Sequence, residues 1–199
     1  MAVKRSFDVV FSGVSLILLA PLIALIGAAI KLEDGGPILF AQERVGKNGR
    51  TFRCYKFRTM VEGAQQRGSG IEIEKDDARI TRIGRLLRST SLDEIPQAFN
   101  VLKGDMSIIG PRPTVMSQVE RYDEVQLRRL EMKPGMAGWA WIHGRNTIPW
   151  ERRIELDVWY IDHWSLWLDV RTFFRALLLL VRRRGVYDVD GTVRDFKES

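Results

Sequence analysis

Residues 9–30 read VVFSGVSLILLAPLIALIGAAI, a run of 22 residues without a charged side chain. As a helix, this run would reach roughly 33 Å, about the thickness of the hydrocarbon core of a bilayer. A cleaved signal peptide is the rival interpretation, because Lys4 and Arg5 precede the run and small residues lie near its end. The run is too long for the apolar region of a signal peptide, so we expect a membrane element.

The charges around this run indicate that both of its ends lie on the same side of a membrane. Basic residues stand before and after it, at Lys4 and Arg5 and then at Lys31, Arg44, Lys47 and Arg50. Pro21 near the midpoint removes a backbone donor and should kink the helix, with Ser12 and Ser15 available to bond the freed carbonyls. We therefore predict a re-entrant helix over residues 1–32. A kinked transmembrane anchor remains the alternative.

The composition of the whole chain limits its partners. The formal charge of +6 and pI of about 9.7 suit an anionic partner, which can be nucleic acid, acidic lipid or a phosphorylated substrate. Cys54 is the only cysteine and His143 and His163 are the only histidines, which excludes an internal disulfide and a Cys/His zinc site. The 199 residues are enough for one core, so we expect residues 33–199 to form one unit with the membrane element.

The middle of the chain alternates between strand and helix patterns. Residues 38–44 and 52–57 are strand-like and are joined by a turn that contains Asn48-Gly49, which predicts a β-hairpin. Residues 63–77 lack periodicity and predict a mobile surface loop. Apolar residues then recur at helical spacing over residues 80–88, and residues 120–132 form a second predicted helix. The predicted fold class is α+β, a mostly helical domain with a short hairpin.

The C-terminal third holds all six tryptophans and an amphipathic helix. The apolar face of this helix contains Leu166, Val170, Phe173, Phe174, Leu177, Leu178 and Val181. Asp169, Thr172 and Arg175 lie opposite. Tryptophans favour the head-group zone and basic amphipathic helices bind anionic lipid, so we expect this region to rest on a membrane surface. The alternative is that the apolar face belongs to an ordinary core.

One acidic pair is a candidate for chemistry, in Ser91-Leu92-Asp93-Glu94-Ile95-Pro96. A capping box from Ser91 to Glu94 would make the pair structural, but Pro96 lies too deep for a helix that begins at Ser91. We expect the helix to begin at Asp93 instead, where its N-terminus favours negative charge and can hold a phosphate. An N-cap at Asp93 and a dipole-complementing acid at Glu94 remain the structural alternatives.

Basic residues surround the acidic pair in the sequence. They are Lys56 and Arg58 after the hairpin, Arg79, Arg82, Arg85 and Arg88 along one helix, and Arg112 in Gly110-Pro111-Arg112-Pro113. The two prolines restrict the turn that presents Arg112, which suits a bidentate grip on phosphate. Structural ion pairing is the alternative, but carboxylates among cations also match phosphoryl transfer. Asp93 and Glu94 offer only oxygen ligands, which indicates Mg²⁺, with Mn²⁺ as the second choice.

Several short motifs follow one another along the chain. They are Lys4-Arg5-Ser6-Phe7-Asp8, Lys56-Phe57-Arg58-Thr59-Met60, Ser91-Leu92-Asp93-Glu94, residues 100–107 (NVLKGDMS), Gly110-Pro111-Arg112-Pro113, Lys133-Pro134-Gly135, Gly138-Trp139 and Gly144-Arg145-Asn146. Taken together and in this order, they resemble the bacterial sugar transferase family. The resemblance runs from about residue 4 to residue 184. It is closest to the small monotopic polyprenol-phosphate phosphoglycosyl transferases, which lack extra spanning helices.

This resemblance implies a reaction, a set of site residues and a location. Asp93 would attack the β-phosphate of a UDP-sugar, release UMP and carry the phosphosugar until polyprenol phosphate takes it. Glu94 would bind Mg²⁺ with Asp93 or assist proton transfer, while the phosphate-binding positions would be Lys56, Arg58, Arg88, Arg112 and Arg145. The enzyme would be monotopic in the bacterial inner membrane, with its site on the cytoplasmic face, and would start glycoconjugate synthesis.

The resemblance has one visible departure, and the sequence leaves one rival function. Many members have Gly-Trp-Ala-Gln-Val-Asn-Gly-Arg where this chain has Trp141 and His143, so the sugar cannot be inferred from relatives. The rival is a non-enzymatic, membrane-anchored basic binding protein that holds acidic lipid or nucleic acid. The basic residues form no tract with interleaved aromatics, so we do not expect nucleic acid as a partner. A homo-oligomer is compatible with the sequence.

Overall fold

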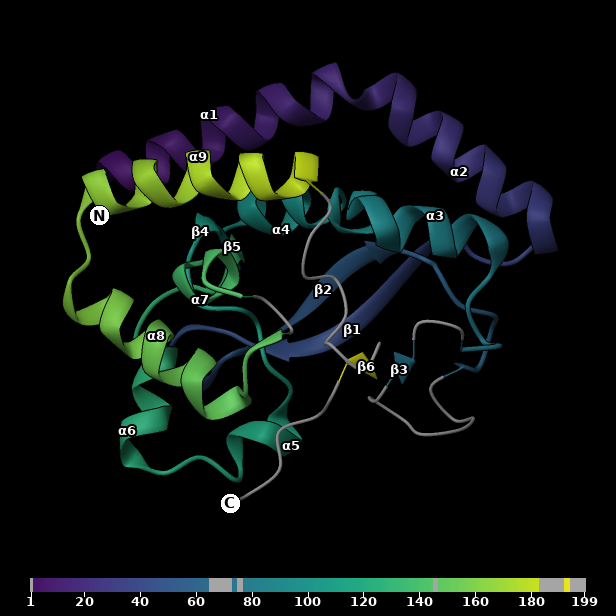
Figure 1. Ribbon diagram of the computed structural model, residues 1–199. Coiled ribbons are helices and arrows are strands. Elements are labelled where there is room, and N and C mark those ends of the chain that lie inside the picture. The colour runs from purple at the N-terminus through teal and green to yellow at the C-terminus, as the bar shows by residue number, and fades with distance from the viewer. Residues whose placement is uncertain (1, 65–72, 75–76, 145–146, 183–191, 194–199) are drawn as a thin grey trace.

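Figure 1 shows the computed structural model, which describes residues 2–64, 73–74, 77–144, 147–182 and 192–193. Within these residues the chain is mostly helical and has three small two-stranded sheets, in agreement with the predicted α+β class. The largest sheet is the predicted hairpin, in which β1 (Leu39–Val45) pairs antiparallel with β2 (Thr51–Phe57). Asn48 and Gly49 supply the positive φ angles of 56° and 76° in its turn (η1, Lys47–Gly49).

The apolar run forms two helices, α1 (Ala2–Leu18) and α2 (Ala20–Asp34), that bend by 61° at Leu19. Pro21 lies in the first turn of α2, where its missing N–H is tolerated, so the bend falls two residues before the predicted kink. Ser12 does not bond a freed carbonyl as we expected. Its hydroxyl is buried and finds no hydrogen-bond partner in the described part of the chain.

Length and apolar composition identify one candidate membrane element among the described residues. No helix there qualifies alone as a span, but α1 and α2 qualify when they are taken together as a bent pair. Figure 1 shows the pair as an arch whose apex points away from the rest of the chain, with both ends returning toward it. Beneath the arch lie α3 (Arg82–Thr90), α4 (Gln97–Lys103) and α9 (Leu166–Arg182).

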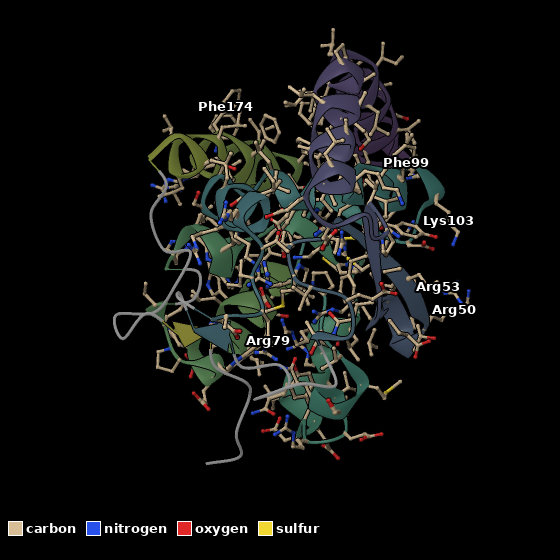
Figure 2. The ribbon with its side chains drawn as sticks, turned by 90° about the vertical axis from the view of Figure 1, so that its right-hand side faces the viewer. Arg50, Arg53, Arg79, Phe99, Lys103 and Phe174 are labelled. Carbon is tan, nitrogen blue, oxygen red and sulfur yellow. The ribbon has the colours of Figure 1, made fainter. Side chains whose placement is uncertain are left out.

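Both α1 and α9 bury several of their polar residues and expose most of their large apolar ones. In α1 the Asp8 carboxylate accepts hydrogen bonds from the Ser107 hydroxyl at 3.1 Å and the Ile108 amide at 3.0 Å, while Ile17 is 75% exposed. In α9, Thr172 is fully buried whereas Trp167 and Phe174 are 74% and 60% exposed. Figure 2 shows Phe174 at the outer edge of the molecule.

This arrangement rules out the simplest alternative for α9. A helix in an ordinary core would turn its apolar face inward, but most of the predicted apolar face is exposed. Its exposed members are Leu166, Val170, Phe174, Leu177 and Leu178. Large exposed apolar patches mark interaction surfaces in proteins.

The main core lies below α1 and α9. It joins the hairpin, through Phe52 and Cys54, to a small parallel sheet of β4 (Ser107–Ile109) and β5 (Gly135–Ala137). The short α7 (Trp139–Ile142) and α8 (Trp150–Asp162) contribute Trp139 and Tyr160 to the same core. Asn100 on α4 ties the hairpin to this core, because its side chain accepts from the Tyr55 amide and donates to the Arg53 carbonyl.

Two predicted segments differ from the structure. The helix expected over residues 120–132 is divided among α5 (Met116–Val119), α6 (Glu124–Leu127) and the 3₁₀ turn η4 (Arg128–Leu130). Asp123 interrupts it because it forms a capping box with Gln126 and so starts a new helix. In the expected loop 63–77, β3 (Ile73–Glu74) pairs with β6 (Thr192–Val193), and most of the remaining loop lies outside the described residues.

Candidate active site

The acidic pair lies in a tight turn between two helices. α3 ends at Thr90 and is capped by Ser91, which adopts a left-handed conformation with φ of 57°. The 3₁₀ turn η3 (Leu92–Glu94) follows. Ser91 makes no side-chain capping bond, so the capping box is absent. The predicted helix start at Asp93 is also inexact, because α4 begins only at Gln97. Asp93 and Glu94 therefore occupy the turn before that helix and do not cap it.

Apolar neighbours fix this turn against the second helix of the arch. Leu92 and Ile95, on either side of the acidic pair, pack against a cluster of four buried side chains. The cluster contains Ile26 and Ile30 of α2, Phe57 of β2 and Leu87 of α3. A shared apolar cluster therefore connects the acidic turn to α2.

Two cations contact the acidic pair. The Lys56 ammonium, at the end of β2, lies 2.6 Å from Glu94 Oε1 and 3.8 Å from Asp93 Oδ2. An Arg112 guanidinium nitrogen lies 3.5 Å from the same Glu94 oxygen. The Arg112 side chain is 42% exposed, whereas those of Asp93 and Glu94 are 13% and 16% exposed. Arg112 therefore keeps donors available at the open side of the site.

Arg88 completes the group of charges around Asp93. Its Nε donates a hydrogen bond of 2.9 Å to the Thr59 hydroxyl. Burial raises the pKa of Asp93, while the positive charges of Lys56, Arg88 and Arg112 oppose that rise. A carboxylate that is poorly hydrated but surrounded by cations is suited to act as a nucleophile toward a phosphate.

The structure thus brings together Lys56, Arg88, Asp93, Glu94 and Arg112 of the predicted site. It places Arg58 elsewhere, in a two-bond ion pair with Asp34 and a 2.6 Å hydrogen bond to the Pro37 carbonyl. These contacts fix the chain where it leaves α2, so the structure does not bring Arg58 to the phosphate-binding group. Arg145 lies outside the described residues, and its role stays a prediction.

Sequence reasoning missed one cation beside the site. Arg44 on β1 is close enough to Arg112 and Glu94 for their charges to change its pKa. In the sequence, Arg44 is recognisable only as one of the basic residues that follow the apolar run. The signal that could have found it is strand periodicity, because Arg44 and Lys56 lie on the same face of the hairpin.

The carboxylates of Asp93 and Glu94 are the candidate ligands for a metal ion. No group of three or more His, Cys, Asp or Glu side chains that could hold a metal occurs among the described residues. Asp93 and Glu94 offer carboxylate oxygens, although one Glu94 oxygen already contacts two cations. Mg²⁺ commonly uses one or two carboxylates and completes its shell with water and substrate phosphates. The residues therefore fit a Mg²⁺ or Mn²⁺ that binds together with a phosphorylated substrate.

Comparison with known proteins identifies the family. A family model described as bacterial sugar transferase matches residues 1–183. The chain belongs to the bacterial sugar transferase family. The match includes α1, the acidic turn and α9, so it spans every element that positions the candidate site.

Relatives of this sugar transferase come from several bacteria. It is 45% identical to the uncharacterized sugar transferase EpsL of Bacillus subtilis, with 92% of this chain and 87% of that protein covered. It is 37% identical to the exopolysaccharide production protein ExoY of Rhizobium meliloti, over 92% of this chain and 88% of ExoY. It is 42% identical to the undecaprenyl-phosphate galactose phosphotransferase of Salmonella typhimurium.

The last relative is much longer than this sugar transferase. The match covers 92% of the chain but only 41% of the Salmonella protein. Membership of the family makes the chain an enzyme of the transferase class. The non-enzymatic binding protein considered from the sequence is thereby set aside.

Proposed function

We propose that this sugar transferase moves a sugar-1-phosphate from a UDP-sugar to polyprenol phosphate, with polyprenyl-diphosphate-sugar and UMP as products. The observation that carries this proposal is the position of the acidic pair, because the residues on either side of it pack against a buried cluster to which α2 contributes Ile26 and Ile30. A site beside a membrane element is accessible both to a soluble donor and to a lipid acceptor. The names of relatives that act on undecaprenyl phosphate support the same reaction.

In the first step, an Asp93 oxygen attacks the β-phosphorus of the donor. The new bond joins this oxygen to phosphorus, and the bond from phosphorus to the bridging oxygen breaks, so that UMP leaves with that electron pair. Lys56 and Arg112 would neutralise charge on the diphosphate, and Arg88 would act from the Thr59 side. The result is a phosphosugar held on the Asp93 carboxylate.

In the second step, an oxygen of polyprenol phosphate attacks the same phosphorus. The bond from phosphorus to Asp93 breaks, which restores the carboxylate and completes the diphosphate of the product. Glu94 would accept the proton of an acceptor that arrives as a monoanion, and the 2.6 Å contact with Lys56 orients Glu94 for this role. Two separate transfers allow one carboxylate to serve both substrates in turn.

Mg²⁺, held by Asp93 and Glu94 together with donor phosphate oxygens, would offset negative charge as UMP leaves. The protein's own cations perform the remaining charge compensation. Arg112 is the most exposed of them, so it is placed to meet the donor first.

We also propose that the α1–α2 arch is a re-entrant element of the bacterial inner membrane, with the site on the cytoplasmic face. The outward-facing apolar side chains of α1 and α9 support this placement, since their polar faces are already occupied by the soluble domain. The reaction would then be the first membrane step of glycoconjugate synthesis.

UMP release from a panel of UDP-sugars, with Mg²⁺ and a short polyprenol phosphate, tests the reaction. We expect acceptor-dependent UMP from at least one donor and polyprenyl-diphosphate-sugar in equal amount. The Asp93→Asn variant, purified in the same way, is the control for contaminating hydrolases. A correctly folded preparation that releases no UMP from any donor would contradict the proposal.

A further inference from the structure

Arg44 is a cation of the hairpin that the proposed mechanism leaves unused. In the hairpin register Gln42 faces Cys54, and Arg44 lies two residues further along the same face. The Arg44 guanidinium donates to the Gln42 side-chain oxygen at 2.5 Å and makes a long contact of 3.5 Å to the Pro113 carbonyl. No carboxylate lies within ion-pair distance of Arg44 in the part of the chain that the structure describes.

The surroundings of Arg44 disfavour its charge. Burial lowers the pKa of Arg44 to about 10, and the positive charge of Arg112 contributes in the same direction. Arg44 and Arg112 share the carboxylate of Glu94, which also pairs with Lys56, so positive charge exceeds negative charge at this point. Proteins retain such an arrangement where a ligand supplies the missing negative charge.

The positions of the charges along the site indicate which part of the donor would supply it. Asp93 interacts with Lys56, Arg88 and Arg112, whereas Arg44 interacts with Arg112 and Glu94. Arg112 is therefore common to both groups and connects them. Arg44 reaches the carbonyl of Pro113, the residue after Arg112. A donor with its β-phosphorus at Asp93 carries its second phosphate one bridging oxygen away, so a donor that lies along Arg112 would bring this phosphate to the side of Arg44.

We infer that Arg44, together with Arg112, binds the phosphate that leaves with UMP. This inference rests on the proposed function, and it assigns the α-phosphate of the nucleotide to a named pair of residues. A guanidinium held by Gln42 on one side still has donors free for bidentate contact with phosphate oxygens. Arg44 would remain protonated throughout and would stabilise charge on the departing group without exchanging a proton.

A structural role is the competing explanation, since Arg44 reaches toward the loop that carries Arg112. That tie is weak, because 3.5 Å is long for a hydrogen bond. The loop has a stronger attachment to the hairpin, in which the Val45 amide donates to the Thr114 carbonyl at 2.8 Å. The loop position therefore does not depend on Arg44.

Direct binding of UMP and of uridine to the purified full-length protein tests the inference. Arg44→Gln should weaken UMP binding by roughly tenfold or more, the usual size for loss of a charged hydrogen bond, and should leave uridine binding unchanged. Arg53→Gln is the matched control, because Arg53 is an exposed arginine on the opposite face of the same hairpin (Figure 2). Arg44→Met also removes the charge but keeps an apolar side chain of similar length, and it serves if the glutamine variant melts early.

The outcomes separate the two proposals. Wild-type protein that neither binds UMP nor releases it would contradict the proposed function itself. Equal UMP affinity in the wild-type protein and in Arg44→Gln or Arg44→Met would overturn the role of Arg44. Equal weakening of UMP and uridine would also overturn it, because a phosphate contact cannot act on uridine. A raised KM for short polyprenol phosphate with unchanged UMP affinity would overturn the assignment to the nucleotide.

Discussion

The ammonium of Lys4 lies 2.7 Å from the Asp169 carboxylate and joins the first turn of α1 to α9 across 165 positions of sequence. Both side chains are nearly buried. Lys4 also donates to the Ile109 carbonyl at 2.8 Å, and Asp169 accepts from the Tyr160 hydroxyl. Buried charges thus attach the two outward-facing apolar helices to the domain that carries the site.

Replacing Lys4 by methionine should destabilise the fold by about 3–5 kcal/mol, the usual result of leaving one partner of a buried pair uncompensated. Thermal denaturation in detergent measures this loss. Arg171→Met changes an exposed cation on α9 and should have little effect. Adding Asp169→Asn to Lys4→Met should recover part of the loss. Equal melting temperatures for the Lys4 and Arg171 variants would show that the pair does not hold the helices.

Both ends of the α1–α2 arch should face the cytoplasm. Cysteines introduced at Val3 and Leu32, which are 65% and 87% exposed, provide the probes, and the native Cys54 is buried. A membrane-impermeant thiol reagent should label neither position in intact cells and both positions in inverted vesicles. Labelling of one end in intact cells would contradict the re-entrant arrangement and would support a kinked transmembrane span.

Asp93→Asn should abolish turnover yet increase the melting temperature at pH 8. Burial raises the pKa of Asp93, so the wild type loses stability as the pH rises from the unfolded pKa through the raised folded pKa. The uncharged amide avoids this loss. The difference between the variant and the wild type should shrink as the pH falls below the raised pKa toward the unfolded value. A variant that is less stable at pH 8 would instead assign Asp93 a structural role.

Lys56→Gln should shift the acidic limb of the profile of kcat/KM against pH to higher pH. Among the charges that lower the pKa of Asp93, Lys56 has the largest effect, so its loss should raise that pKa further. We also expect kcat/KM at neutral pH to fall about a hundredfold. Lys56→Arg keeps the charge and should retain the wild-type limb. A glutamine variant whose profile is only scaled down would separate Lys56 from the ionisation of Asp93.

Local patterns predicted the hairpin, the bent N-terminal element and the outward face of α9, because each depends on spacing within one segment. Asn48-Gly49 required a turn, and Pro21 required an interruption nearby. The sequence did not predict that the helix over residues 120–132 is divided. The Asp123 side chain forms a capping bond that starts a new helix there, and the spacing of apolar residues carries no information about this bond.

The sequence predicted most of the charged residues of the site but not which of them lie close to Asp93. Arg58 and Arg88 carry the same charge, and the resemblance implies phosphate binding for both, yet Arg58 pairs with Asp34 while Arg88 binds Thr59 beside Asp93. Only tertiary packing separates them, since Asp34 reaches Arg58 from the end of α2. Arg44 was missed for the related reason that its neighbour Arg112 comes from a distant loop.

UMP release before any acceptor is present tests the central claim, that Asp93 carries the phosphosugar. With the correct UDP-sugar and Mg²⁺ but no polyprenol phosphate, a rapid-quench experiment should show one burst of UMP limited by the number of enzyme sites. Mass spectrometry of the quenched protein should then find the phosphosugar on a peptide that contains Asp93, after extraction of co-purified lipid acceptor. A preparation that turns over with acceptor, yet gives neither burst nor adduct without it, would contradict the covalent mechanism.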